Sequence, residues 1–337
     1  MNVPEYTILT RPASIFGLLR ATGRNMARAL LYASRGNMAA ASEAFGYGGH
    51  PAVTRSLVIG LGQLETSFNY NPLFAADVGP TVIVLSNVRA LAQALVLKQQ
   101  GKIKKIAAGP NLVKLPKDQG NILADPGIDY CLVPSQIVAA AYCALSPVLA
   151  QKTVVWYAGV NQEYWQPQKL EAPPGQQILL YVKNASNKLV AEVSALVLQL
   201  GFQAKIVVYG KYSPDDFRQS LGQSAAAIFL SERESQGIAL TESWAMNVPT
   251  LVWDPQLRHE LLPELPTSPA PYLTKATGLF WKNTNELKQL LVSLPELLPS
   301  FSPRAWVLQH MTDRIAAQNL LNLLQTPAHS AAKTSTI

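Results

Sequence analysis

The sequence predicts an α/β protein built from two doubly wound parallel sheets, and three observations support this. Short, near-continuously apolar segments rich in Val, Ile and Leu recur along the chain, as is typical of strands buried on both faces. Amphipathic segments of helical period lie between them, for example 88–100 and 187–200. The alternation pauses once, at 161–176, a polar stretch with three prolines. That pause predicts a linker between two Rossmann-like domains facing across a cleft.

Five strands are expected before the linker and four after it. They are 56–61, 81–86, 103–108, 130–134 and 153–158, followed by 177–182, 203–209, 225–230 and 248–253. The first domain is then 1–160, with 1–50 as a helical N-terminal extension, and the second is 177–325. Residues 302–325 read as one long amphipathic helix that crosses back, and 326–337 as a disordered tail. Ligands of such sheets bind at the carboxyl ends of the strands.

Composition narrows the classes of partner. The 337 residues are 48% hydrophobic and 15% charged, which supplies a core and disfavours disorder. A formal net charge of +7 favours anionic partners, but the basic residues are not interleaved with aromatic stacking residues, so nucleic acid is not expected. No membrane span or signal peptide is recognised, and Cys131 and Cys143 are read as buried, reduced thiols. A cytoplasmic location is therefore expected.

The stretch SERESQGIALTESWAMNVPTLVWDP, 231–255, follows a predicted buried strand and begins a helix near Gly237. The first turn of a helix carries free amides and the positive end of the dipole, so Gly237, Ile238 and Ala239 suit a diphosphate. Glu234 before the helix and Glu242 within it suit sugar and ribose hydroxyls. The alternative is a surface helix with solvated carboxylates.

This stretch resembles the donor-site motif of the family 4 glycosyltransferases, in which two glutamates flank a glycine and an alanine-methionine pair leads to a proline and a strand. Glu234, Gly237 and Glu242 match the motif, whereas Gln236 stands where an aromatic residue is usual. The resemblance implies the GT-B fold, a nucleotide-sugar donor and hexosyl transfer with retention of anomeric configuration. It also implies that Glu234 holds the transferred sugar and Glu242 the ribose.

The resemblance extends over roughly 56–255. The segment 129–142 is similar to the family's strand that ends in serine, and 157–167 to its entry into the second domain, with Asn161 replacing the usual aspartate. Lys183 and Lys188 keep the spacing of a basic pair that faces the diphosphate in the family. Two cations at a strand end suit a pyrophosphate. The alternative interpretation is that Lys183 and Lys188 are ordinary exposed lysines.

The acceptor side has weaker signals. The loop 59–72 occupies the place of a glycine-rich loop, and its Asn69 and Asn71 have side chains suited to sugar hydroxyls. Asn111 follows a strand where many family members carry a histidine. No Asp-x-Asp triplet and no zinc-like spacing of His and Cys is present, so neither a metal nor any other cofactor is expected.

An N-terminal helix is expected to be amphipathic. Arg20, Arg24 and Arg28 fall on one helical stripe, and apolar residues face the other way: Ile15, Leu19, Met26 and Leu30. Two interpretations stay open. The helix either docks on an anionic membrane surface, as suits a glycolipid acceptor, or packs on its own domain with a solvated basic face.

Three functions therefore compete. The leading one is a retaining, metal-independent glycosyltransferase acting on a glycan or lipid-linked acceptor. The second is a nucleotide-sugar 2-epimerase, which shares the fold and needs no acceptor. The third is a non-catalytic GT-B-like binding protein, which the departures at Asn161, Lys183 and Gln236 keep open.

Overall fold

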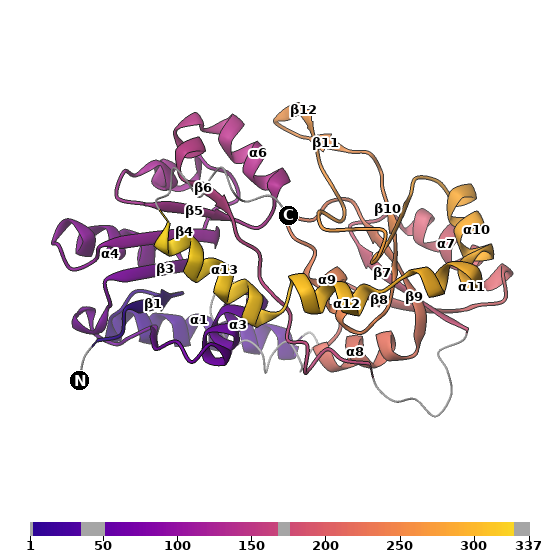
Figure 1. Cartoon of the computed structure of the whole chain (residues 1–337), viewed down its shortest axis with the longest axis horizontal. Helices are drawn as coiled ribbons and strands as arrows, with labels where there is room; N and C mark the ends of the chain where they lie inside the picture. The colour runs from indigo at the N-terminus through magenta and orange to yellow at the C-terminus, as the bar shows by residue number, and fades with distance from the viewer. Residues whose placement is uncertain (1–2, 35–50, 168–175, 327–337) are drawn as a thin grey trace. The chain divides into compact units, whose positions relative to one another are not determined.

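The computed structural model describes residues 3–34, 51–167 and 176–326. Contacts divide the chain into two compact units (Figure 1). The first comprises Met1–Gly159 together with Asp313–Ile337, and the second is the continuous segment Val160–Thr312. Residues 327–337 of the predicted tail and residues 168–175, half of the predicted linker, lie outside the described residues.

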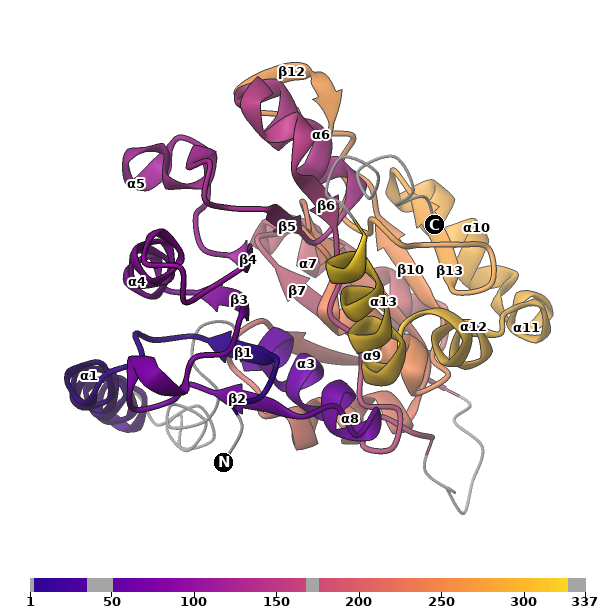
Figure 2. The ribbon, with the colours of Figure 1, turned by 60° about the vertical axis from the view of Figure 1, so that its left-hand side comes forward.

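The first unit is built on a six-stranded parallel sheet in the order β2-β1-β3-β4-β5-β6. Its strands are β1 (Tyr6–Leu9), β2 (Phe68–Tyr70), β3 (Thr81–Ser86), β4 (Lys105–Asn111), β5 (Tyr130–Val133) and β6 (Thr153–Val155). Its helices are α1 (Ile15–Ser34), α3 (Pro51–Gln63), α4 (Val88–Gln99), α5 (Asp118–Asn121), α6 (Gln136–Leu145) and α13 (Asp313–Gln325). Figure 2 shows β2, β1, β3, β4 and β5 in this order, between α4 and α13.

The beginning of this unit differs from the sequence prediction in two places. The predicted strand 56–61 is wrong, because these residues belong to helix α3. The buried positions of α3 follow a helical period, and they are Val53, Thr54, Ser56, Leu57, Gly60 and Leu61. The first strand is instead β1, inside the segment predicted as a helical extension. A four-residue strand before a long amphipathic helix gives little pattern to recognise.

The strands of this sheet are buried on both faces. Leu9, Val82 and Ile106 pack with α4 in one cluster, while Ile8 and Ile83, one position earlier or later, are also fully buried. Alternate residues of a strand point to opposite faces, so the second set faces the other helical layer. Cys131 belongs to the α4 cluster, and its burial raises the pKa of its thiol to about 12, whereas Cys143 is only partly buried.

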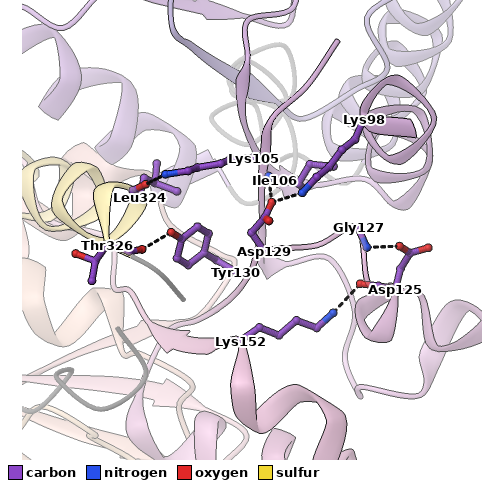
Figure 3. A network of polar contacts seen from close by, with 10 residues as sticks. All are labelled: Lys98, Lys105, Ile106, Asp125, Gly127, Asp129, Tyr130, Lys152, Leu324 and Thr326. Carbon is purple, nitrogen blue, oxygen red and sulfur yellow. Dashed lines mark hydrogen bonds and ion pairs between the residues drawn. The ribbon is translucent and has the colours of Figure 1, made fainter. Parts of the chain in front are cut away.

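Helix α13 is anchored to the first unit (Figure 3). Lys105 Nζ donates to the carbonyl oxygen of Leu324 at 2.6 Å, and the Tyr130 hydroxyl donates to the carbonyl of Thr326. Both bonds satisfy carbonyls beside the end of the helix, and the lysine also complements the negative end of the dipole. Close packing against α3 occurs at Gly60, where a Cβ atom would lie 2.1 Å from the carbonyl oxygen of Asp313.

The second unit contains a five-stranded parallel sheet in the order β13-β10-β9-β7-β8. Its strands are β7 (Gln177–Lys183), β8 (Gln203–Val208), β9 (Ser224–Ser231), β10 (Thr250–Trp253) and β13 (Gly278–Trp281), and β11 (Arg258–His259) and β12 (Leu262–Pro266) form a separate pair. Its helices are α7 (Asn187–Gln199), α8 (Pro214–Gly222), α9 (Ile238–Ala245), α10 (Thr284–Val292), α11 (Leu294–Leu297) and α12 (Pro303–His310). Strand β13 and the β11–β12 pair were not expected, because the sequence beyond 255 reads as mostly helical.

Two cores cover the faces of the second sheet. One joins Leu179 and Tyr181 of β7 to residues of α8, α9 and α12, including Trp244. The other joins Ile178 and Leu180 to residues of α7 and α10. Helices therefore cover both faces, which leaves the strand ends as the places where polar groups gather.

The predicted helix 302–325 is two helices. Helix α12 ends at His310, and α13 begins at Asp313. Between them Thr312 forms a parallel bridge with Val160, whose amide donates to the carbonyl of Met311 at 2.8 Å. This pairing needs extended backbone, so a continuous helix is incompatible with it.

Candidate functional site

The topology of the second sheet places a candidate site at the ends of β7 and β9. The chain order along this sheet reverses between these two strands, and such switch points are where ligands of open α/β sheets bind. Lys183 is the last residue of β7, and Ser231 is its register partner at the end of β9. The loop from Ser231 to Gly237 then carries Glu234 to the same place.

Lys183 and Glu234 form a bidentate ion pair. Lys183 Nζ donates to Oε1 and Oε2 of Glu234 at 2.8 and 2.7 Å. Ser231 Oγ donates to Oε1 at 3.0 Å, and the backbone amide of Glu234 donates to the carbonyl of Ser268. The lysine and glutamate side chains are only 21% and 12% exposed. Because both partners are largely desolvated, this pair is held far more rigidly than a surface ion pair.

An aromatic ring adjoins the same lysine. Lys183 Nζ lies 4.7 Å from the centre of the Tyr209 ring, and Tyr209 follows the neighbouring strand β8. Tyr209 is 53% exposed, so one part of the ring is available for stacking. Tyr209 and Ser231 were not among the residues predicted from the sequence. Ser231 ends β9 and Tyr209 directly follows β8, so a polar or aromatic residue at the carboxyl end of a strand is the signal that finds both.

Helix α9 begins at Gly237 without a side-chain cap. Gly237 has φ of +86° and ψ of 57°, a left-handed conformation that glycine adopts without the penalty of a side chain. The amides of Ile238 and Ala239 lie in the first turn and have no intrahelical acceptor. The helix start is therefore able to receive an anion.

Glu242 lies one turn further along α9 and is half-buried. Its negative charge adds to burial in raising the pKa of Tyr212, and it contributes in the same sense at Tyr181. Glu242 and these two tyrosines thus share one environment. Gln236, which replaces the aromatic residue of the family motif, is 5% exposed. A buried amide at this position keeps hydrogen-bonding capacity where the family pattern has a ring.

Lys188 occupies a different environment from Lys183. It is the second residue of α7, its side chain is 87% exposed, and its Nζ lies 3.9 Å from Glu192 one turn later. The structure brings Lys183, Glu234 and the start of α9 onto one edge, whereas Lys188 is a solvated side chain near it.

The three asparagines proposed for the acceptor side have separate environments. Asn69 Nδ2 donates to the carbonyl of Asp77 at 2.7 Å. Asn71 has φ of +49°, and its Oδ1 accepts from the amides of Thr10 and Arg11 at 2.8 and 3.2 Å. Both residues therefore join loops of the first unit. Asn111 ends β4, and its buried Nδ2 has no hydrogen-bond partner among the described residues. The predicted loop 59–72 is the end of α3 followed by β2, so Gly60 serves helix packing.

In the described part of the chain, no three His, Cys, Asp or Glu side chains gather as ligands for a metal ion. Within the same residues, no helix combines the length and the apolar character needed to cross a bilayer.

Solved structures with a similar arrangement of strands and helices identify the fold. The chain is similar to HepE of Anabaena in a structure with UDP and glucose, with a TM-score of 0.55 and 11% identity over 96% of this chain and 99% of that one. The chain has the GT-B fold. The chain is also similar to sucrose-phosphate synthase of Thermosynechococcus elongatus, with a lower TM-score of 0.48 and 13% identity over 73% of each chain. The galactosyltransferase WaaB scores 0.47 at 14% identity, covering 73% of this chain and 75% of that one. No protein-family model and no curated protein sequence matches the sequence.

The GT-B fold confirms the predicted two Rossmann-like domains. Each sheet has its first strand between its second and third, so the two units share one winding order. The expected boundaries of β3, β5, β7, β8 and β9 each agree with the structure to within one residue.

Proposed function

We propose that this protein is a retaining glycosyltransferase of the family 4 type, which transfers a hexosyl group from a nucleotide-sugar donor to a glycan or lipid-linked acceptor. One observation carries the proposal. A largely desolvated Lys183–Glu234 pair stands at the switch point of the second sheet, with Lys183 at the end of β7 and Glu234 in the loop that leads to the uncapped start of α9. That combination provides a cation, a carboxylate and backbone donors for one diphosphate sugar. HepE, whose fold is similar, has been solved with UDP and glucose.

Each residue has a distinct role in this proposal. The amides of Ile238 and Ala239, with Lys183 and the more exposed cation of Lys188, stabilise the charge that develops on the departing diphosphate. Gly237 leaves the approach to those amides open. Glu234 binds hydroxyls of the transferred sugar, Glu242 those of the ribose, and Gln236 lines the donor side.

Tyr209 extends the donor site. Its half-exposed ring lies against Lys183 and offers a face on which the nucleobase stacks. In this proposal the donor is held by its base, ribose and diphosphate, so the reacting sugar carbon is positioned before the acceptor arrives. No metal is required, because the lysines and the helix start supply the positive charge.

We propose that transfer with retention of anomeric configuration needs little acid–base catalysis by protein side chains. Glu234 contacts Lys183 and Ser231 before the donor binds and hydroxyls of the transferred sugar afterwards, so we assign it no role as base. The departing phosphate then accepts the proton of the acceptor hydroxyl. Bond cleavage at the donor carbon and bond formation to the acceptor take place on one face of the sugar, which preserves its configuration.

The decisive experiment incubates the full chain with a panel of nucleotide sugars and follows nucleotide release with and without candidate acceptors. Acceptor-dependent release that is lost in Glu242→Ala and Lys183→Gln supports glycosyl transfer. A sugar altered at carbon 2 without any acceptor identifies an epimerase instead. Binding of the nucleotide without turnover identifies the non-catalytic alternative, and no binding at all rejects the site.

From the exposed surface of helix α1 we also propose that this protein is cytoplasmic and binds peripherally to an anionic membrane. Ile15, Phe16, Leu19, Met26 and Leu30 are each more than half exposed, so this apolar stripe does not pack into the core. Arg20 and Arg24 are exposed on the same helix, while the side chain of Arg28 lies outside the described residues. Residues 6–42 contain no acidic side chain. Exposed apolar and cationic groups on one helix suit the interface of an anionic bilayer.

A further inference from the structure

The carboxyl edge of the first sheet contains buried polar groups that the protein does not satisfy. Ser86 ends β3 and is 4% exposed, and Ser135 follows β5 and is 1% exposed. Neither Oγ atom has a hydrogen-bond partner among the described residues, and the same holds for Nδ2 of Asn111 at the end of β4. Buried hydroxyl and amide groups are normally paired, so three unpaired ones on consecutive strands indicate a missing partner.

The sheet register brings these groups together. Ser86 and Asn111 are direct register partners across β3 and β4. Ala108 pairs with Cys131 across β4 and β5, which puts Ser135 within about one rung of Asn111. Because adjacent strands are about 4.8 Å apart, the three residues follow one another closely along the carboxyl edge of the sheet.

Arg11 adds a positive charge at the same edge. Leu9 pairs with Val84, so Arg11, two residues beyond β1, stands level with Ser86. The chain order of this sheet reverses between β1 and β3, which makes this the switch point of the first unit. Arg11 is half-buried and donates to the carbonyls of Pro12 and Asn71. Within the described residues, no carboxylate lies within ion-pair distance of it.

The surroundings favour an anion over a neutral sugar. The segments that follow these strands carry Arg89 in the first turn of α4 and Lys114 and Lys117 before α5. The first acid among them, Asp118, accepts with its carboxylate from the amide of Leu115 at 2.8 Å. Helix α6 begins at Gln136, and its N-cap residue Ser135 makes no side-chain capping hydrogen bond. Asn111 Nδ2 is a donor only, and both serine hydroxyls can donate. Several donors, a guanidinium and a helix start match the oxygens of one phosphate.

We propose that Ser86, Asn111, Ser135 and Arg11 form a binding site for a phosphate group on the acceptor. This inference rests on the proposed function for the role of the ligand as acceptor, and it specifies a phosphorylated acceptor. The phosphate oxygens accept from the serine hydroxyls, the Asn111 amide and the first turn of α6. Arg11 provides the compensating charge.

The test titrates the full chain with sn-glycerol 3-phosphate and, separately, with glycerol, while amide NMR shifts are followed. Saturable shifts at the start of α6 with the phosphate ester, and none with glycerol, are expected. Inorganic phosphate reports whether the phosphate group alone suffices, and equal binding of both phosphates still supports the site. Equal shifts with glycerol would overturn the proposal in favour of a neutral polyol site, and no saturable shift with the ester would also overturn it.

Variants locate the site. Ser135→Ala and Ser86→Ala are expected to weaken ester binding at least about tenfold, since each removes a buried donor. Asn111→Asp keeps the shape and adds a negative charge, so it abolishes binding even where a serine variant folds poorly. Ser194→Ala is the matched control, because Ser194 Oγ is also buried and unpaired but belongs to α7 of the second unit. An equal loss in Ser194→Ala would contradict the assignment.

A parallel titration with UDP separates this inference from the proposed function. Shifts at Gly237 with UDP and none at α6 with the ester leave the donor site intact and reject the phosphate site. Shifts at α6 without any UDP binding reject the donor site and leave an anion site of another role. Shifts at both places support both.

Discussion

Lys183 Nζ contacts both carboxylate oxygens of Glu234, at 2.8 and 2.7 Å, so two largely buried charges at the carboxyl ends of β7 and β9 neutralise each other. A diphosphate that binds here must replace Glu234 as the partner of the lysine. The released carboxylate then becomes available for the hydroxyls of the transferred sugar. The ion pair thus keeps both side chains in place before the donor arrives.

Replacement of Lys183 by Gln is expected to weaken UDP binding by about 10- to 100-fold, the effect of losing a charge-assisted contact. Lys188→Gln is expected to weaken it only a few-fold, because that side chain is 87% exposed. Isothermal titration of the two variants gives the comparison. An equal loss in both would show that Lys188 moves to the diphosphate on binding.

Glu242→Ala separates ribose binding from diphosphate binding. The variant is expected to weaken UDP binding by about tenfold or more, since it removes a carboxylate acceptor for two hydroxyls. Binding of inorganic pyrophosphate, which lacks the ribose, is expected to change little. A comparable loss for both ligands would argue that Glu242 acts through the structure of α9.

Gly60 and Gly62 form a matched pair within α3. A Cβ on Gly60 would lie 2.1 Å from the carbonyl oxygen of Asp313 and 2.7 Å from Cβ of Ala317, whereas one on Gly62 meets nothing within 4 Å. Gly60→Ala is expected to lower the free energy of unfolding by at least about 1–3 kcal/mol, and Gly62→Ala to raise it by up to about 1 kcal/mol. Urea unfolding measures both, and a neutral Gly60→Ala would contradict the close helix contact.

Asp313 predicts a pH dependence of stability. Burial raises its pKa to about 6, against a smaller opposing effect of a hydrogen bond from Ser56 and the charge of Arg55. The folded protein keeps this proton while the unfolded chain loses it near pH 4, so folding is favoured by low pH. The contribution is lost as pH rises from about 4 to about 6 and is absent above.

Asp313→Asn removes that dependence. Each pKa unit corresponds to about 1.4 kcal/mol, so the variant is expected to be more stable than the parent at pH 7 by up to about 3 kcal/mol, and similar to it near pH 4. Urea unfolding at the two pH values measures the difference. A constant difference between parent and variant at all pH values would assign the effect to packing.

The exposed stripe of α1 predicts membrane binding. Liposomes containing anionic lipid are expected to float the full chain, and binding is expected to fall when Phe16 and Leu19 are replaced by Ser, or when salt is raised. The matched control replaces Leu198, an exposed residue of α7, by Ser. Flotation that does not depend on lipid charge, or that is equal in the α1 variant and the Leu198 control, would reject docking through α1.

The sequence predicted two doubly wound parallel sheets because buried parallel strands are apolar runs bounded by polar residues. It also selected Glu234 and Gly237 from a strand–turn–helix pattern and Lys183 from the spacing of the motif that it resembles, and the fold brings these three residues to one edge. The ion pair between Lys183 and Glu234 was not predictable, since it depends on side chains from β7 and the loop after β9, 51 positions apart.

Other errors have equally specific causes. The run SLVIGLG has strand-like composition, but its contacts with α13 make it a helix, and tertiary packing overrides local preference. The break before Asp313 depends on a bridge between Thr312 and Val160, which lies far away in the sequence. Ser86 and Ser135 end apolar runs, but only the structure shows that their hydroxyls are unpaired.

The anchoring of α13 determines the order in which the chain can complete its folding during synthesis. The second unit is one uninterrupted segment, so all of its strands have been made once Thr312 leaves the ribosome. The first unit begins earlier but needs α13 to cover Gly60 and to accept the hydrogen bonds of Lys105 and Trp156. The unit that starts first is therefore finished last, because its α3 face is covered only once α13 has been made.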